Sequence, residues 1–183
     1  KSNDYIDNFF EERKGYEFVD YDRVPPDRKM LLRRLNKYYF RRVCVSQNTI
    51  VSRIYAVANL FLGALELFVG MFLKPATTKY PDDYWKKGSA YFDITHECAK
   101  YVLSRKDEIR KLFRFSSTCD EVFLQTIIYH SEYKDKLSDL TLRYIDWHNH
   151  GRSPEILGSE HRDKIKPPEV LFARKFSYDL SPE

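Results

Sequence analysis

A run of twenty mostly apolar residues, IYAVANLFLGALELFVGMFL from Ile54 to Leu73, constrains the fold of this chain most strongly. A helix that spans a bilayer needs about 20 such residues. Glu66 and Asn59 lie within the run, however, and an acid in mid-membrane costs about 2.5 kcal/mol or more. The pattern therefore favours a buried or half-buried helix. A spanning helix is one alternative, because of the length of the run. A helix on the membrane surface is another, because four cations flank the run: Arg41, Arg42, Arg53 and Lys74.

Length and composition indicate an ordinary globular chain. It has 183 residues, of which 43% are hydrophobic and 32% charged, so we expect a single domain with a substantial core. The net charge is +4, from 31 basic and 27 acidic residues. This mixed surface does not predict a nucleic-acid-binding protein, although it leaves room for one basic pocket that binds phosphate.

The cysteines and the N-terminus bear on location. Three cysteines without a C-x-x-C motif predict neither a disulfide framework nor a zinc site, which favours the cytoplasm. The first 21 residues lack the apolar core of a signal peptide. They resemble a segment from within a longer protein.

Short strands alternate with helices along the sequence. Alternating or aromatic-rich patterns predict strands at residues 16–21, 89–94, 142–147 and 170–176. Helices are expected at residues 2–14, after Thr95, at 105–113 and from 117 or 118 to 128. Residues 35–45 fit a strand or a helix. The alternation predicts an α/β fold, with α+β as the alternative.

The stretch STCDEVFLQTII, residues 117–128, offers the clearest carboxylates for chemistry. Ser117 with Asp120, or Thr118 with Glu121, has the spacing of a capping box at the start of a helix. A carboxylate at a helix N-terminus beside a pocket would also suit a general base. On spacing alone the structural role is favoured for both acids, and Val122–Ile128 would form the core-facing body of the helix.

Other candidate residues are each open to two interpretations. Arg174 and Lys175 end an apolar run and could form a solvated strand end or a phosphate clamp. Trp147 could pack in the core or offer a platform for a sugar. His148 and His150 lack the further Cys or His partners of a metal site, so no metal is expected.

Four segments, in their order along the chain, carry a family resemblance: WKKGSAYFDITHECAKYVL, STCDEVFLQTII, YIDWHNHGRSPEIL and LFARKF. This order resembles the core-2/I-branching β-1,6-N-acetylglucosaminyltransferases, family 14 of the glycosyltransferases, which includes the peptide O-xylosyltransferases. The matching motifs look like Gly88–Phe92, Thr118–Glu121 and Phe172–Phe176. The resemblance covers nearly the whole chain, and it is better after Trp85 than before it.

The resemblance implies the acceptor-side, C-terminal part of a GT-A-like α/β domain, with a mixed sheet and flanking helices. It implies inverting transfer of a sugar, of GlcNAc or xylose type, from a UDP-sugar to a hydroxyl of a glycan or other acceptor. Glu121 occupies the position of the catalytic base. Basic side chains would hold the UDP phosphates without a metal or other cofactor, namely Lys175, Arg174 and Arg152. Acceptor contacts would come from Trp147, Asp20 and Arg33.

Departures from the animal enzymes suggest a bacterial-type relative. Three cysteines cannot reproduce the many disulfides of those enzymes, and Asn149 stands where they carry a Tyr. The donor-binding half is not among these residues, so this piece alone is expected to bind UDP-sugar poorly. The alternative is a non-catalytic module that binds a carbohydrate or a partner. We expect a cytoplasmic protein, and residues 54–73 leave open an association with the inner face of the membrane.

Overall fold

Two compact units make up the protein. The computed structural model describes residues 1–22, 28–40, 49–117, 119–148 and 153–177. Unit 1 comprises Lys1–Asp20, Tyr91–Thr95 and Asp135–Glu183, and unit 2 comprises Tyr21–Ala90 and His96–Lys134. Each unit is therefore built from segments that are far apart in the sequence. The single domain expected from chain length stays a prediction.

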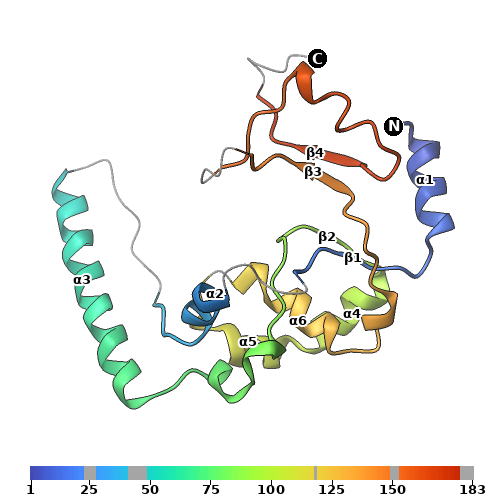
Figure 1. Ribbon diagram of the computed structural model, residues 1–183. Coiled ribbons are helices and arrows are strands. Elements are labelled where there is room, and N and C mark those ends of the chain that lie inside the picture. The colour runs from blue at the N-terminus through green and yellow to red at the C-terminus, as the bar shows by residue number, and fades with distance from the viewer. Residues whose placement is uncertain (23–27, 41–48, 118, 149–152, 178–183) are drawn as a thin grey trace. The chain divides into compact units, whose positions relative to one another are not determined.

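Unit 1 carries the strands. In its described residues, helix α1 (Asn3–Glu12) precedes strand β1 (Phe18–Val19), which pairs antiparallel with β2 (Phe92–Asp93). Strand β3 (Arg143–Ile145) pairs parallel with β4 (Phe172–Arg174), and a 3₁₀ turn, η5 (Ser159–His161), lies between them in sequence (Figure 1). All four strands fall where the sequence predicts them. They form two small sheets, so the single mixed sheet implied by the resemblance is not present in the described part of the chain.

Local sequence explains how unit 1 begins. Ser2 caps α1, because its hydroxyl accepts a hydrogen bond from the backbone N–H of Tyr5. Gly15 adopts a φ of 88°, which favours glycine, and this turns the chain toward β1. The fully buried Glu17 then accepts hydrogen bonds from the backbone N–H and the hydroxyl of Thr95, at 2.7 and 2.6 Å. A buried carboxylate thus fixes the end of the β2 segment to the start of β1.

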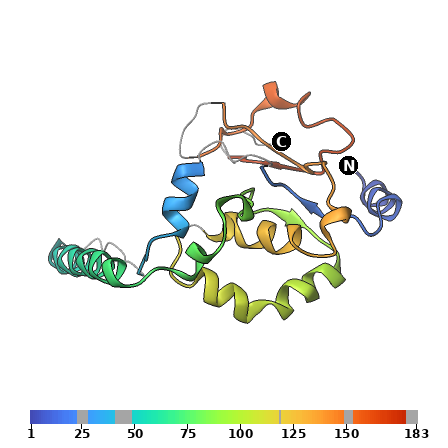
Figure 2. The same cartoon turned by 60° about the horizontal axis from the view of Figure 1, so that its bottom comes forward.

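Unit 2 is helical. Its described elements follow the chain as α2 (Arg28–Leu35), α3 (Thr49–Phe72), η1 (Ala76–Lys79), η2 (Asp82–Tyr84), α4 (His96–Ser104), α5 (Lys106–Phe113), η3 (Cys119–Glu121) and α6 (Phe123–Tyr129). Helix α4 contacts both α5 and α6, and the three lie together in both views (Figures 1 and 2). The core of the unit joins α2 to the later elements through Leu31, Leu35, Trp85, Leu112, Phe113 and Val122.

Helix α3 contradicts the favoured interpretation of the apolar run. None of its residues is buried, and its long apolar side chains are exposed. It is also long and apolar enough to cross a membrane. The prediction of a buried helix is therefore wrong, and only one face of α3 is half-buried. The sequence pattern misled because it registers apolarity, whereas burial depends on whether another element covers the helix.

The segment between α2 and α3 forms neither of the expected elements in its described part. Helix α2 ends at Leu35, and residues 36–40 continue without helix or strand. The backbone N–H of Tyr39 instead donates to the carbonyl oxygen of Phe115, at 2.7 Å. Residues 41–45 of the expected element lie outside the described residues.

Candidate active site

The predicted site residues divide between the two units. Glu121 and Arg33 belong to unit 2, whereas Asp20, Trp147, Arg174 and Lys175 belong to unit 1. Arg152 lies outside the described residues, as do Thr118, His150 and Asn149.

Glu121 does not cap helix α6. It ends the 3₁₀ turn η3, and α6 begins two residues later at Phe123, after Val122 at the N-cap. Among the described residues, no side chain caps the first turn of α6. No side-chain capping box is therefore present at the described start of α6, where the backbone closes a 3₁₀ turn through Val122 N–H and Cys119 O, at 3.0 Å. The predicted box of Thr118 with Glu121 involves a residue outside the described residues.

The segment after Trp85 is hydrogen-bonded directly to the Glu121 region. Gly88 N–H donates to the carbonyl oxygen of Glu121 at 2.9 Å, and the amide nitrogen of the Gln125 side chain donates to Ser89 O at 2.6 Å. Lys86 N–H donates to the hydroxyl of Thr126 at 3.0 Å. Two segments that carry the family resemblance thus hold each other in place, and the base candidate lies at their junction.

The side chain of Glu121 remains accessible at this junction. It is 36% exposed, and its Oε2 lies 3.7 Å from Nζ of Lys87. The residues that follow it, from Leu124 to Ile128, are buried, as predicted for the body of this helix. Lys87 is a charged neighbour that sequence reasoning missed. The signal was its place in WKKG, immediately before the glycine of the Gly88–Phe92 motif.

A substitution at Thr126 tests how much the hydrogen bonds of this junction contribute to the free energy of unfolding. Thr126→Val keeps the shape of this buried side chain but leaves the part-buried Lys86 N–H without its acceptor. We expect the free energy of unfolding in urea to fall by about 1–3 kcal/mol. Thr141→Val, at an exposed threonine, is the matched control and should stay within about 0.5 kcal/mol of wild type. Equal effects of the two changes would contradict a structural role for the Thr126 hydroxyl.

In unit 1, the parallel pairing of β3 and β4 brings Trp147 and the two cations to one end of a sheet. Ile145 lies opposite Arg174 in the register, so Trp147 and Lys175 both follow the carboxyl ends of their strands. Trp147 is 50% exposed, which excludes the core alternative for its side chain. Lys175 is also exposed, and its carbonyl accepts a hydrogen bond from Leu157 N–H at 2.7 Å. This end of the sheet therefore offers an aromatic face and a cation to solvent.

A cluster of two arginines around Tyr91 links the strands of unit 1. The guanidinium carbon of Arg174 lies 5.1 Å from the centre of the Tyr91 ring, and that of Arg143 lies 5.5 Å from it. Arg143 also binds both carboxylate oxygens of Asp93. The cluster holds Arg174 against an aromatic ring, a contact that guanidinium groups favour. Sequence reasoning missed Arg143 and Asp93, because nothing in their spacing links residues 50 positions apart.

Asp146 fixes the turn that presents Trp147. Its Oδ1 accepts the backbone N–H of His148 at 2.8 Å, and its Oδ2 accepts the hydroxyl of Tyr144 at 2.9 Å. Nζ of Lys164 lies 3.5 Å from Oδ2. These contacts lower the pKa of the Asp146 carboxyl, with the His148 hydrogen bond as the largest cause.

The lowered pKa of Asp146 predicts a pH dependence of stability. Its carboxylate contributes stability that is fully present above about pH 4 and is lost as the pH falls through the folded-state pKa. The free energy of unfolding of wild type should therefore exceed that of Asp146→Asn at pH 6, and the difference should shrink toward pH 2. Urea titrations at several pH values would measure it. A difference that stays constant over this range would rule out the ionised carboxylate as its source.

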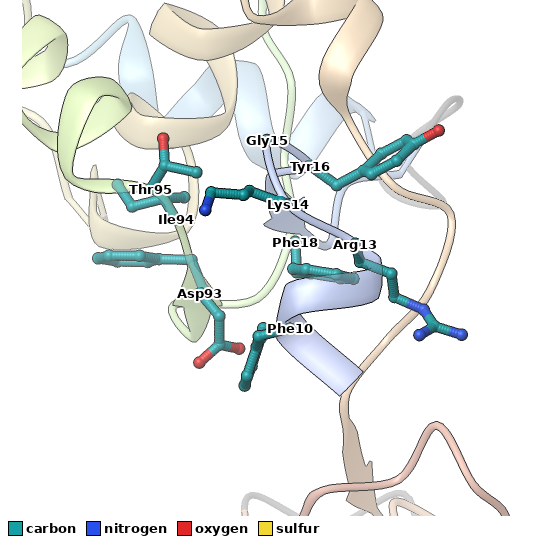
Figure 3. Close-up of a pocket in the computed structure, with 10 residues that line it drawn as sticks. Phe10, Arg13, Lys14, Gly15, Tyr16, Phe18, Asp93, Ile94 and Thr95 are labelled. Carbon is teal, nitrogen blue, oxygen red and sulfur yellow. The ribbon is translucent and has the colours of Figure 1, made fainter. Parts of the chain in front are cut away.

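A pocket of about 500 Å³ lies elsewhere in unit 1, between the end of α1 and the β1–β2 pair. Phe10, Phe18, Phe92 and Tyr16 supply aromatic walls, and Lys14, Asp93 and Thr95 add polar groups (Figure 3). Aromatic walls with a few polar groups suit a small polar ligand such as a sugar. The sequence did not predict this pocket. Its aromatic residues at 16–21 indicated a strand, and nothing in that pattern showed that a pocket would form beside it.

The structure gives only the place and the exposure of the two remaining acceptor candidates. Asp20 is exposed at the end of the β1 segment, and Arg33 is exposed on α2. Within the described residues, no group of three or more His, Cys, Asp or Glu side chains is placed to bind a metal ion. The acceptor roles of both residues and a metal-independent reaction stay predictions.

Comparison with known proteins identifies the family. The family model for the Core-2/I-Branching enzyme matches residues 1–166, which is most of the chain. The match includes Glu121 and Trp147 but ends before β4, so Arg174 and Lys175 lie beyond it. A search of the curated proteins finds no match. Because the family model covers well over half of the sequence, this chain belongs to the core-2/I-branching enzyme family, whose members are glycosyltransferases.

Proposed function

We propose that this chain is the acceptor-side part of an inverting, UDP-sugar-dependent glycosyltransferase with a GT-A-like fold. The observation that carries the proposal is the position of Glu121. It is a half-exposed carboxylate that does not cap α6, next to the hydrogen-bonded Gly88–Ser89 segment. Membership of the family supplies the class of reaction, and this carboxylate supplies a group that could perform its proton transfer.

Glu121 acts as the general base in this proposal. The acceptor hydroxyl oxygen attacks the anomeric carbon of the sugar and forms the new glycosidic bond. The bond from that carbon to the UDP phosphate oxygen breaks, and UDP leaves with the electron pair. The proton of the acceptor hydroxyl goes to the carboxylate of Glu121. Attack from the face opposite UDP inverts the configuration of the anomeric carbon.

Lys175, Arg174 and Arg152 bind the phosphates of UDP in the same proposal. Negative charge accumulates on the leaving diphosphate, and cationic donors placed beside it would stabilise that charge without a metal ion. The ring-stacked Arg174 ends β4 and the exposed Lys175 follows it directly, which supports this assignment. The donor sugar is GlcNAc or xylose in type, as the family resemblance implies.

Trp147 provides the acceptor platform, and Asp20 and Arg33 contribute acid and base contacts to the acceptor. The half-exposed indole of Trp147 and the turn fixed by Asp146 support a rigid aromatic surface. A sugar ring presents C–H groups that stack well on such a surface. The acceptor is a glycan or another carbohydrate hydroxyl.

A second candidate function is binding without catalysis. The aromatic-walled pocket beside α1 favours it, because a pocket of this kind can hold a carbohydrate without any reaction. Saturation-transfer NMR with a panel of mono- and disaccharides, using wild type and Tyr16→Ala, would test this function separately from transfer.

We place the protein in the cytoplasm, at the inner face of a membrane. The cysteine content favours the cytoplasm. The exposed apolar helix α3 supports the membrane location.

The test of the proposed function is UDP release by the full-length gene product. It is incubated with UDP-GlcNAc or UDP-xylose and a panel of glycans. We expect acceptor-dependent UDP release with one of the two donors, and the product should carry the inverted anomeric configuration by NMR. Addition of EDTA should leave the rate within about twofold, because cationic side chains replace the metal. Loss of activity in EDTA, with recovery on adding a divalent cation, would contradict the metal-independent mechanism.

A further inference from the structure

Helix α3 presents a continuous apolar surface to its surroundings. Leu60 is 75% exposed, Phe61 69% and Phe72 72%, and Leu65, Leu67, Phe68 and Met71 between them are exposed as well. None of the 24 residues of the helix is buried. Monomeric soluble proteins rarely leave so many large apolar side chains in contact with water. We therefore expect another protein surface or a membrane to cover this helix.

The two faces of α3 differ in exposure. Its half-exposed positions include the polar Ser52, Asn59 and Glu66 and the largely apolar Tyr55, Leu62 and Val69, which recur at spacings of three and four and therefore share one face. This face is turned toward the rest of the chain, because Glu66 Oε1 accepts the backbone N–H of Phe40 at 2.6 Å. The one acid of the helix is thus engaged within the protein, and the opposite apolar face points outward.

The attachment of α3 argues against a membrane-spanning helix. Leu35, before the helix, and Thr77, after it, are hydrogen-bonded through Thr77 Oγ1 and Leu35 O at 2.8 Å. Leu35 also packs in one core with Trp85. A single crossing would separate these residues, and the 13 residues from 36 to 48 are too few for a second helical span of about 20. Non-helical backbone exposed to lipid is not tolerated, so α3 leaves and rejoins the protein on one side.

Charge distinguishes a lipid surface from a second copy of the chain. Residues 28–81 contain ten Lys or Arg and one acid, although the whole chain has 31 basic and 27 acidic residues. The rest of the chain therefore carries an excess of acids. Cations around an apolar helix are attracted to anionic lipids, whereas two copies that met through α3 would bring like charges together.

We propose that α3 is an interfacial helix that docks the protein on an anionic lipid bilayer. The helix lies in the plane of the membrane surface, its apolar face enters the boundary between headgroups and acyl chains, and the surrounding cations contact lipid phosphates. The protein is thereby monotopic, and the parts of unit 2 before and after α3 lie on the same side of the bilayer. This inference does not depend on the proposed transferase chemistry.

Flotation with vesicles tests the proposal on the complete chain. The probes are vesicles of phosphatidylcholine alone and of phosphatidylcholine with 30% phosphatidylglycerol. Wild type should float with the anionic vesicles, and the bound fraction should fall at least tenfold for the double variant Phe61→Asp with Phe68→Asp. Both side chains are exposed, so folding should persist, and circular dichroism checks it. Leu103→Asp, at a 67% exposed leucine on α4, is the matched control and should bind like wild type.

Each alternative result overturns the proposal. If wild type stays in the unbound fraction, or if the double variant floats as well as wild type, α3 does not dock on lipid. Equal binding to neutral and anionic vesicles overturns the role of the cations. A wild-type dimer in sedimentation analysis that does not float, and that becomes monomeric in the double variant, identifies a second copy as the occupant.

Depth measurements separate an interfacial helix from a spanning one. In Phe68→Trp, bromine atoms placed near the headgroups should quench the added fluorescence more strongly than bromines placed near the bilayer centre, relative to wild type. Stronger quenching by the deep bromines would overturn the interfacial geometry.

Discussion

Glu121→Gln in the full-length gene product lowers the rate of sugar transfer by about 100-fold or more, with UDP binding retained. The amide keeps the size of the carboxylate but cannot take the proton of the acceptor hydroxyl, and general bases contribute about 10²–10⁴-fold to such reactions. The backbone contact of Glu121 with Gly88 N–H is unaffected by this substitution, so the turn should keep its shape. The measurement is UDP release with saturating donor, together with a UDP titration by calorimetry.

Asp120→Asn is the matched control, because it removes an exposed carboxylate from the same 3₁₀ turn. It should retain transfer within a few-fold of wild type. Equal losses in the two variants would show that the charge of the turn matters rather than a base at Glu121. Unchanged turnover in Glu121→Gln would exclude the base assignment altogether.

Lys175→Ala raises the dissociation constant of UDP by about 10- to 100-fold. A charged hydrogen bond to phosphate is worth about 1.5–3 kcal/mol, and every 1.4 kcal/mol changes affinity tenfold. The side chain is exposed, so its removal should not reduce the stability of the fold. The full-length gene product is titrated with UDP by calorimetry at constant ionic strength.

Lys166→Ala is the control for the loss of a positive charge. This lysine is in the same unit, is largely exposed and pairs with Asp163 at 2.6 Å. It should leave UDP affinity within about twofold. A UDP titration of Lys175→Ala that matches wild type would remove this residue from the phosphate site and leave it as a solvated strand end.

The sequence predicted some of the site residues and their exposure but not others. The family order pointed to Glu121 and Trp147, and both lie in exposed or half-exposed positions. The sequence did not locate the start of α6. A capping pattern depends on where the helix begins, and α6 begins at Phe123, after a 3₁₀ turn and without a side-chain cap. Lys87 and Arg143 went unnoticed, because their contacts join segments that are distant in sequence.

By itself, the sequence determined the family, the four strands and the existence of a long apolar helix. These features follow from local order, from alternation and from a run of apolar residues, all of which can be read along one chain. Only the tertiary structure decided what surrounds each element. It left α3 uncovered, paired β3 with β4 in parallel so that Trp147 and Lys175 follow one sheet edge, and bound Gly88 to Glu121. The physical reason is that burial, strand pairing and hydrogen bonds between distant segments depend on which elements meet, and periodicity within one element carries no information about its partner.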